Sequence, residues 1–220
     1  MDKNHNVISP FDAILAVAIT FVLSLFLGSA FVVLFGYGVA MILGELLLLV
    51  VPLAYMLFQR INITNYVNVD VRLKTILLGI AIGAILLLAN VAITAAVISV
   101  FGVSEAIEET NTLIVEMSGS LAWLVSVVVA LSLAGLCEEF AFRGFLQNAI
   151  TKKHSFGTAL LTSSLVFGVF HFDPQAAYTV SAFIMGLLFG FIYHRWNSYV
   201  VPAVAHSTMN LVALGVMLFA

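Results

Sequence analysis

Charged side chains are scarce in this chain. Asp, Glu, Lys and Arg make up only 9% of its 220 residues, whereas ordinary soluble domains are about a quarter charged. Hydrophobic residues make up 63%, and a soluble protein of this length could not bury that much apolar surface, because small domains keep much of their surface in water. The scarcity of charge therefore excludes an ordinary soluble domain, and a bilayer is the environment that accommodates such a sequence.

Disulfides and strongly charged partners are excluded as well. The chain has one cysteine, Cys137, so no internal disulfide can form. Its net charge of −3 gives no electrostatic reason to expect a nucleic-acid partner. The first apolar run has no cleavable small-residue site after it, so we interpret it as a retained span. Because there is no internal repeat, low-complexity segment or linker, we expect one transmembrane domain over residues 1–220, surrounded by membrane lipids.

Long apolar runs predict an all-α, polytopic transmembrane helix bundle of about seven spans, because a spanning helix needs about 20 mostly apolar residues. The first run is too long for one span, and Gly36-Tyr37-Gly38 is its natural break. A polar loop is expected over 59–72, and a short surface helix in the acidic stretch 102–118. The predicted spans lie near 11–34, 38–58, 74–101, 121–150, 156–172, 176–194 and 199–219.

Loops with basic residues and loops without them alternate along the chain, as a topology of seven spans requires. The basic residues of the tails and loops all fall on one side of the membrane, and the intervening loops have none. The positive-inside rule makes that side cytoplasmic. We therefore expect the N-terminus in the cytoplasm, the C-terminus outside, and the plasma membrane as the location. The residues on the cytoplasmic side are Lys3, Arg60, Arg72, Lys74, Lys152, Lys153 and Arg195.

Two adjacent carboxylates and an arginine lie inside the fourth predicted span. A charge at the centre of a bilayer costs on the order of 3 kcal/mol or more, so such residues usually have a function. Glu139 and Arg143 are four residues apart, so they share a helix face and can pair. Glu138 points about 100° away from Glu139 and stays free to face a cavity. A free carboxylate in such a place suits general acid or base catalysis.

Two more polar clusters lie inside predicted spans. His171 follows Phe167 with a spacing of four. His206 and Asn210, also four apart, share one helix face and offer two hydrogen-bonding groups to the same point, which could hold a metal or donate to a developing oxyanion. Glu45 in the second span is a further buried charge, which could line an access path or bond to a neighbouring helix.

The three motifs together resemble the signature of the CAAX protease and bacteriocin-processing (CPBP or Abi) family. They are Glu138-Glu139-x-x-x-Arg143, Phe167-x-x-x-His171 and His206-x-x-x-Asn210, in this order. The family comprises intramembrane endopeptidases and includes the type II CAAX prenyl proteases. The resemblance covers about 120–218, so we expect a four-span catalytic core over 119–220 and variable N-terminal helices over 1–118.

The resemblance implies hydrolysis of a peptide bond inside the membrane, by a water that Glu138 and His171 position and activate. It also implies that His206 and Asn210 stabilise the oxyanion. Glu139 and Arg143 would orient the site. The implied substrates are peptides or lipidated peptides, such as prenylated CAAX ends, bacteriocin leaders and membrane-anchored peptides.

A zinc ion is a second way to activate water in such a site. The family is labelled metalloprotease, and Glu138, His171 and His206 could ligate zinc while leaving one position open. The chain has no His-Glu-x-x-His motif, in which two histidines four apart share a helix face. A metal-free water activated by glutamate is equally consistent with these residues.

Three other functions compete with proteolysis by Glu138. A proton-coupled transporter or channel could use buried Glu and His residues as a relay, although no repeat supports it. A family member could instead serve as a membrane scaffold or bacteriocin-immunity protein. A cysteine protease would use Cys137, which points about 100° away from Glu138.

Overall fold

The computed structural model describes residues 7–219 as an assembly of helices, and the predicted all-α membrane bundle is confirmed. Six helical segments in this range are long and apolar enough to cross a membrane. A shorter apolar helix of 15 residues, α8 (Phe156–Phe170), corresponds to the fifth predicted span. The six longer segments are α1 (Pro10–Phe35), α2 (Tyr37–Phe58), α4 (Leu73–Phe101), α6 (Leu121–Glu139) with its continuation to Thr151, α9 (Ala177–Trp196) and α10 (Val200–Phe219).

The continuation of α6 is wound more loosely than an α-helix. It consists of a π-helical segment, η1 (Phe140–Gln147), followed by α7 (Asn148–Thr151). Two short helices complete the chain. The polar loop predicted over 59–72 contains α3 (Ile63–Val67), and the acidic stretch forms the predicted surface helix, α5 (Glu105–Met117).

Serine caps and glycines determine where several helices begin and end. Ser9, Ser120 and Ser155 accept hydrogen bonds from backbone N–H groups in the first turns of α1, α6 and α8, which satisfies donors that a helix start leaves free. Gly36 separates α1 from α2 with a φ of 77°, in the left-handed region that glycine adopts without steric cost. The predicted break between the first two spans is thereby confirmed.

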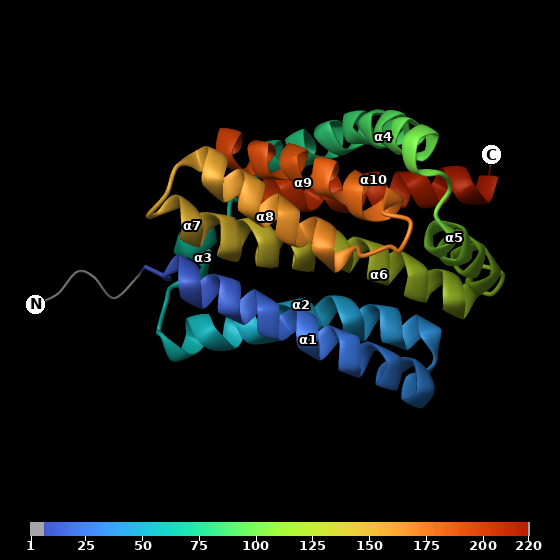
Figure 1. Cartoon of the computed structure of the whole chain (residues 1–220), viewed down its shortest axis with the longest axis horizontal. Coiled ribbons are helices and arrows are strands. Elements are labelled where there is room, and N and C mark those ends of the chain that lie inside the picture. The colour runs from blue at the N-terminus through green and yellow to red at the C-terminus, as the bar shows by residue number, and fades with distance from the viewer. Residues whose placement is uncertain (1–6, 220) are drawn as a thin grey trace, which may run out of the picture.

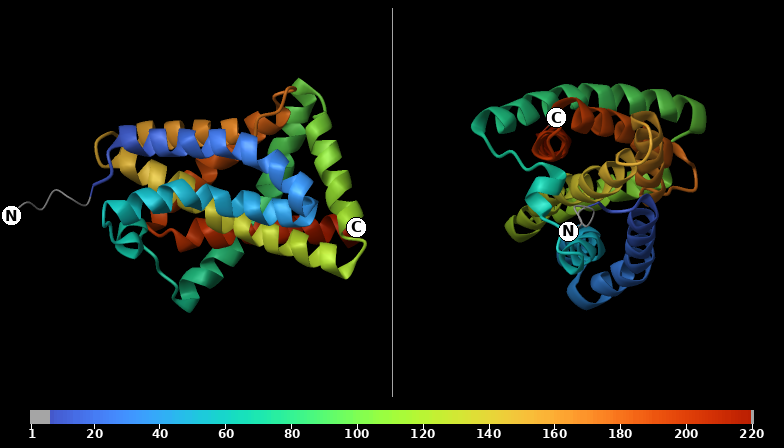
Figure 2. Two further views of the ribbon diagram at one scale, coloured as in Figure 1. Left: turned by 90° about the horizontal axis from the view of Figure 1, so that it is seen from below. Right: turned by 90° about the vertical axis from the view of Figure 1, so that its left-hand side faces the viewer.

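Helix α6 lies at the centre of the bundle. It packs against α2 on one side and α10 on another, while α4 and α9 pack against α10 and α8 packs against α9. Helices α1 and α2 pair as a separate layer (Figure 1). Helix α5 runs across one end of the bundle (Figure 2). The central position of α6 brings its carboxylates within reach of helices from both halves of the chain.

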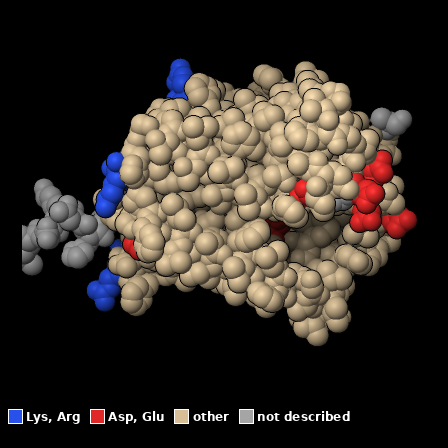
Figure 3. Space-filling view, viewed as in Figure 1, with Lys and Arg blue, Asp and Glu red and all other residues tan. Residues whose placement is uncertain are grey.

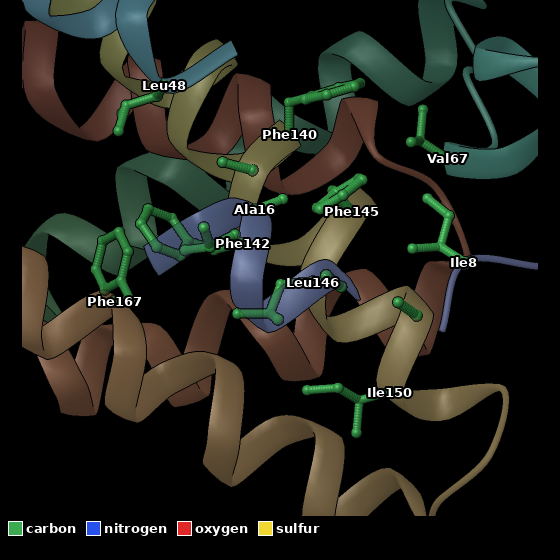
Figure 4. Close-up of a cluster of buried hydrophobic side chains, with 14 of the residues drawn as sticks. Ile8, Ala16, Leu48, Val67, Phe140, Phe142, Phe145, Leu146, Ile150 and Phe167 are labelled. Atoms are coloured by element: carbon green, nitrogen blue, oxygen red, sulfur yellow. The ribbon is translucent and has the colours of Figure 1, made fainter. Parts of the chain in front are cut away.

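A cluster of buried apolar side chains holds η1 in place (Figure 4). Phe142 contacts the rings of Phe167 and Phe170 edge to face, with centroids 5.1 and 4.9 Å apart. Aromatic pairs in this arrangement are favourable beyond their buried area. Residues of α1 and the segment before it, and of α2, α3, η1, α7 and α8, meet in this cluster. They include Ile8, Ala16, Leu48, Val67, Phe140, Phe145, Leu146 and Ile150.

Exposed basic side chains and a group of acidic side chains lie at opposite ends of the bundle. Figure 3 shows Lys and Arg side chains at the end where α1 begins, and a group of acidic side chains at the other end. That group lies where α5 carries Glu105, Glu108, Glu109 and Glu116. Lys3, which belongs to the predicted cytoplasmic set, lies outside the described residues. The separation is the pattern on which the predicted orientation depends.

Candidate functional site

The carboxylates of α6 meet α10 because the two helices approach closely at Gly135. A Cβ atom at this position would collide with the side chain and backbone of Ser207 and with the carbonyl oxygen of Ala203. The hydroxyl of Ser207 also donates a hydrogen bond of 2.7 Å to the carbonyl of Ser132. This contact places His206 beside the paired carboxylates, one turn farther along α6.

Glu139, Arg143 and His206 form a buried ionic cluster, and the predicted ion pair is part of it. Arg143 Nη1 donates to Glu139 Oε1 at 3.0 Å, and neither side chain is exposed. His206 Nδ1 lies 3.1 Å from the same oxygen. A carboxylate paired with a guanidinium only accepts hydrogen bonds, so His206 Nδ1 must be the donor in this contact. Glu139 therefore fixes which way the His206 ring faces.

Side chains of η1 tie this cluster to α9. The second terminal nitrogen of Arg143 donates to the carbonyl of Gly186 at 3.0 Å. One turn later, Gln147 Nε2 donates to the carbonyl of Gly190 at 2.9 Å and its Oε1 accepts from Ser163 at 3.1 Å. We did not predict the role of Gln147, although its spacing of four from Arg143 in an apolar span was a signal. These bonds satisfy polar groups that would be costly if buried without partners.

Glu138 faces both histidines without a hydrogen bond to either. Its Oε1 lies 3.8 Å from His171 Nε2, and its Oε2 lies 3.8 Å from His206 Nδ1. The other nitrogen of His171, Nδ1, is 2.9 Å from the carbonyl of Phe167 and so must donate to it. In the neutral ring this leaves Nε2 as an acceptor. The two acceptor atoms therefore lie 3.8 Å apart, and a group able to donate to both, such as water, can bridge them from one side.

The loop that carries His171 is organised by Asp173, a buried residue that the sequence marks only as the end of a span. Its two carboxylate oxygens accept from the backbone N–H groups of Gln175 at 3.2 Å and Tyr178 at 2.9 Å. Its own N–H donates to Thr179 Oγ1, and that hydroxyl donates to the carbonyl of His171. Burial opposes ionisation, but the hydrogen bonds, including one from Ser104, hold the pKa of Asp173 below its ordinary value. An Asp shortly before a helix start was the signal for this role.

Asn210 and Cys137 lie apart from this arrangement. The amide of Asn210 donates a long hydrogen bond of 3.5 Å to the carbonyl of Leu131 on α6. Within residues 7–219 it has no hydrogen bond to Glu138 or His206. Cys137 is 1% exposed and belongs to the apolar cluster of η1.

The donor groups do not fit a zinc site as they are arranged. His206 uses Nδ1 as a donor toward Glu139, so this nitrogen cannot ligate a metal at the same time. Across the described part of the chain, no group of three His, Cys, Asp or Glu residues is placed to hold a metal ion.

The family resemblance indicated by the three motifs is confirmed by comparison with known proteins. Residues 120–212 match the family model described as type II CAAX prenyl endopeptidase Rce1-like. Over 112 residues the chain is 34% identical to "Putative membrane peptidase YdiL" of Bacillus subtilis (strain 168), which covers 50% of this chain and 43% of that protein. The matched region of the family model contains all three motifs.

A second relative is "UPF0177 protein YxdF" of Lactococcus lactis subsp. lactis (strain IL1403). It is 28% identical over 89 residues, which cover 40% of this chain and 45% of that protein. The chain thus spans less than half the length of these curated relatives. No solved structure matches the chain.

Proposed function

We propose, from the Rce1-like C-terminal region and the geometry of its carboxylates, that the protein is an intramembrane endopeptidase. The observation that carries the proposal is the gap of 3.8 Å between Glu138 Oε1 and His171 Nε2. A water beside these two atoms, on the open side, would donate one hydrogen bond to each acceptor and turn its lone pairs outward. A carbonyl carbon approaching from the open side would then meet a nucleophile that is already oriented.

The proposed reaction uses Glu138 as the general base. Glu138 takes a proton from the water as its oxygen attacks the carbonyl carbon, while His171 holds the water in line. His206 and Asn210 stabilise the oxyanion that forms. For this role the Asn210 amide must leave the carbonyl of Leu131, and a bond of 3.5 Å is weak enough to release it at little cost. Glu139 and Arg143 keep His206 oriented throughout.

The substrate proposed for this site is a peptide or lipidated peptide, CAAX-type prenylated or bacteriocin-like, that reaches it from the membrane. We propose that the four-span core acts within one transmembrane domain in the plasma membrane, with the N-terminus in the cytoplasm. The separation of basic and acidic side chains to opposite ends supports this orientation.

Glu138→Gln tests the proposal most directly. The full chain would be placed in lipid nanodiscs with quenched fluorescent peptides, one farnesylated at a C-terminal CAAX sequence and one unlipidated. We expect cleavage by the natural chain and a loss of at least about 100-fold in Glu138→Gln, because a general base contributes 10²–10⁴-fold. The matched control is Glu116→Gln, which changes an exposed acid on α5. Cleavage at the natural rate in Glu138→Gln would sink the proposal.

Metal dependence is measured on the same protein. We expect full activity after dialysis against a chelator and no stoichiometric zinc by elemental analysis. Loss of activity that zinc alone restores would instead identify Glu138, His171 and His206 as zinc ligands in a conformation that differs from the described one.

A further inference from the structure

A polar cavity of about 460 Å³ lies apart from the candidate site. Two stretches that are distant in the sequence form its wall: one leads from α3 into α4, and the other joins α9 to α10. Figure 1 shows α3 at the end of the bundle where α1 begins, which is the end that carries the basic side chains. The residues that line the cavity are Asn68, Val69, Asp70, Val71, Arg72, Trp196, Asn197 and Ser198.

Hydrogen bonds join the two stretches and hold the wall of the cavity. The side-chain amide of Asn68 donates to the carbonyl of Asn197. The N–H of Tyr199 donates to the carbonyl of Asn68 at 3.3 Å. Helices α4 and α10, which begin directly after the two stretches, also pack against each other. The cavity is therefore built between two connected segments and is not a space beside a free loop.

The starts of α4 and α10 differ in how their polar groups are satisfied. At α4, the carboxylate of Asp70 accepts from the backbone N–H of Arg72 at 3.2 Å, so an acid already occupies the place that a helix start offers to negative charge. At α10, the N–H groups of Val200 and Val201 have no backbone acceptor within the described residues. Such first-turn donors point out of the helix start, toward the residues before it. Among these is Ser198, which is 4% exposed and whose hydroxyl is buried without a hydrogen-bond partner.

Positive charge exceeds negative charge around the cavity. Asp70 is the one carboxylate in its wall among the described residues, and it is bound by Nε and Nη2 of Arg72 at 2.7 and 2.5 Å. These two bonds leave Nη1 of Arg72 for another acceptor. Arg195 lies over the ring of Trp196, with its guanidinium carbon 5.6 Å from the ring centroid. Lys74, two residues after Arg72, adds a further exposed cation. An anion in the cavity would therefore be attracted.

Apolar side chains at the rim suit the tail of a lipid. Val71 and Leu73 are 70% and 71% exposed, and Trp196 is 38% exposed. Tryptophan is enriched at the level of the lipid headgroups, where its ring meets both apolar and polar surroundings. A ligand that matches the cavity and its rim has an anionic head and an apolar tail, and a phospholipid has both.

We propose that this cavity binds the phosphate of an anionic phospholipid from the leaflet at the basic end of the bundle. The phosphate oxygens accept hydrogen bonds from Arg72 and from the N–H groups at the start of α10. The Ser198 hydroxyl turns toward the phosphate, since a serine side chain has three staggered positions. Basic pockets between membrane helices bind anionic headgroups in this manner. The lipid site is independent of the proposed endopeptidase function, because it contains none of the residues assigned to catalysis.

Trp196 can report the binding of this lipid directly. The chain has two tryptophans, so Trp123→Phe leaves Trp196 as the only one. This chain would be placed in phosphatidylcholine vesicles that contain phosphatidylglycerol or phosphatidylcholine brominated near the carbonyl end of the acyl chains, because bromine quenches tryptophan fluorescence on contact. We expect half-maximal quenching at an about tenfold lower fraction of the brominated phosphatidylglycerol.

Variants in the same background separate the cavity from the general attraction of basic side chains for anionic lipid. We expect Ser198→Ala and Arg72→Gln each to reduce the preference for phosphatidylglycerol to about threefold or less. The matched control is Lys152→Gln, which removes an exposed cation outside the wall and should keep the full preference. Equal quenching by both lipids, an unchanged preference in Ser198→Ala or Arg72→Gln, or an equal loss in Lys152→Gln would overturn the site.

Inorganic phosphate distinguishes a lipid phosphate from a free one. Added to vesicles that contain the brominated phosphatidylglycerol, it should leave the quenching of Trp196 unchanged, because the lipid is held by its tail as well as its head. Relief of the quenching by phosphate at constant ionic strength would overturn the lipid as the occupant of the cavity.

Discussion

The N-terminal half of this chain (residues 1–118) and the C-terminal half (residues 119–220) are made from similarly apolar helices, yet they differ in the side chains that they bury. Helices α1 and α2 expose large side chains such as Phe26 and Val33, at 75% and 84%, as lipid-facing helices can. The segment from α6 to η1 buries Glu139 and Arg143 completely. Because burying charge is expensive, the C-terminal half must keep the partners of these two side chains in place, whereas exposed apolar side chains carry no such requirement. The family match to 120–212 follows this division.

The comparison is sharpest for the two arginines. Arg143 is completely buried, and Arg72 at the start of α4 is 67% exposed beside Asp70. We expect Arg143→Met to lower the free energy of unfolding by about 3–5 kcal/mol, because it leaves Glu139 as an uncompensated buried charge. Arg72→Met should cause a much smaller loss, since exposed pairs contribute little. Denaturant titration in detergent measures both, and equal losses would contradict the division.

One glycine from each half tests whether the C-terminal helices are packed more tightly than the N-terminal ones. Gly135 lies where α6 touches α10, whereas a methyl group added at Gly44 on α2 would have no other atom within 4 Å. We expect Gly135→Ala to destabilise the protein by about 3 kcal/mol, because backbone atoms must move apart. Gly44→Ala should stabilise it by about 0.5–1 kcal/mol through helix propensity. Thermal unfolding of the two variants decides the matter, and a stabilising Gly135→Ala would show that the helices can separate freely.

Asn210 tests the oxyanion site that is proposed in the C-terminal half. We expect Asn210→Ala to lower kcat about 100-fold with KM unchanged, because it would remove the proposed oxyanion donor. The contact with Leu131 is too long to contribute much stability, so the melting temperature should stay the same. A variant with natural kcat would leave His206 to stabilise the oxyanion without Asn210.

The lengths of the apolar runs, the spacing of polar residues and the energetic cost of burying charge predict much of this architecture from the sequence. The spans, the break at Gly36 and the surface helix α5 follow from local composition, and the pair of Glu139 with Arg143 follows from a spacing of four. The π-helical winding of η1 and the contacts of Asn210 could not be predicted, because they depend on how closely α10 and α9 approach α6. Gly135 permits that approach, but a glycine in an apolar run does not reveal which helix will pass it.

Asp173 joins the two halves, since its loop carries His171 and its carboxylate accepts a hydrogen bond from Ser104. We expect Asp173→Asn to lower the free energy of unfolding by about 1–2 kcal/mol at pH 7, because charge-assisted bonds to backbone N–H groups are lost. The pKa of Asp173 is lowered in the folded protein. Its stabilisation is therefore fully present above the ordinary carboxyl pKa of about 3.9 and is lost as the pH falls through the lowered folded value.

The difference in unfolding free energy between the natural chain and Asp173→Asn should accordingly be constant between about pH 5 and 7 and shrink below about pH 3.9. Urea titrations over this range measure it, with Ser104→Ala as the variant that removes the bond from Ser104 to Asp173 together with the N-cap of α5. A pH-independent difference would mean that the Asp173 side chain acts by its shape and not by its charge. A Ser104→Ala variant that is as stable as the natural chain would show that the His171 loop holds its position without the N-terminal half.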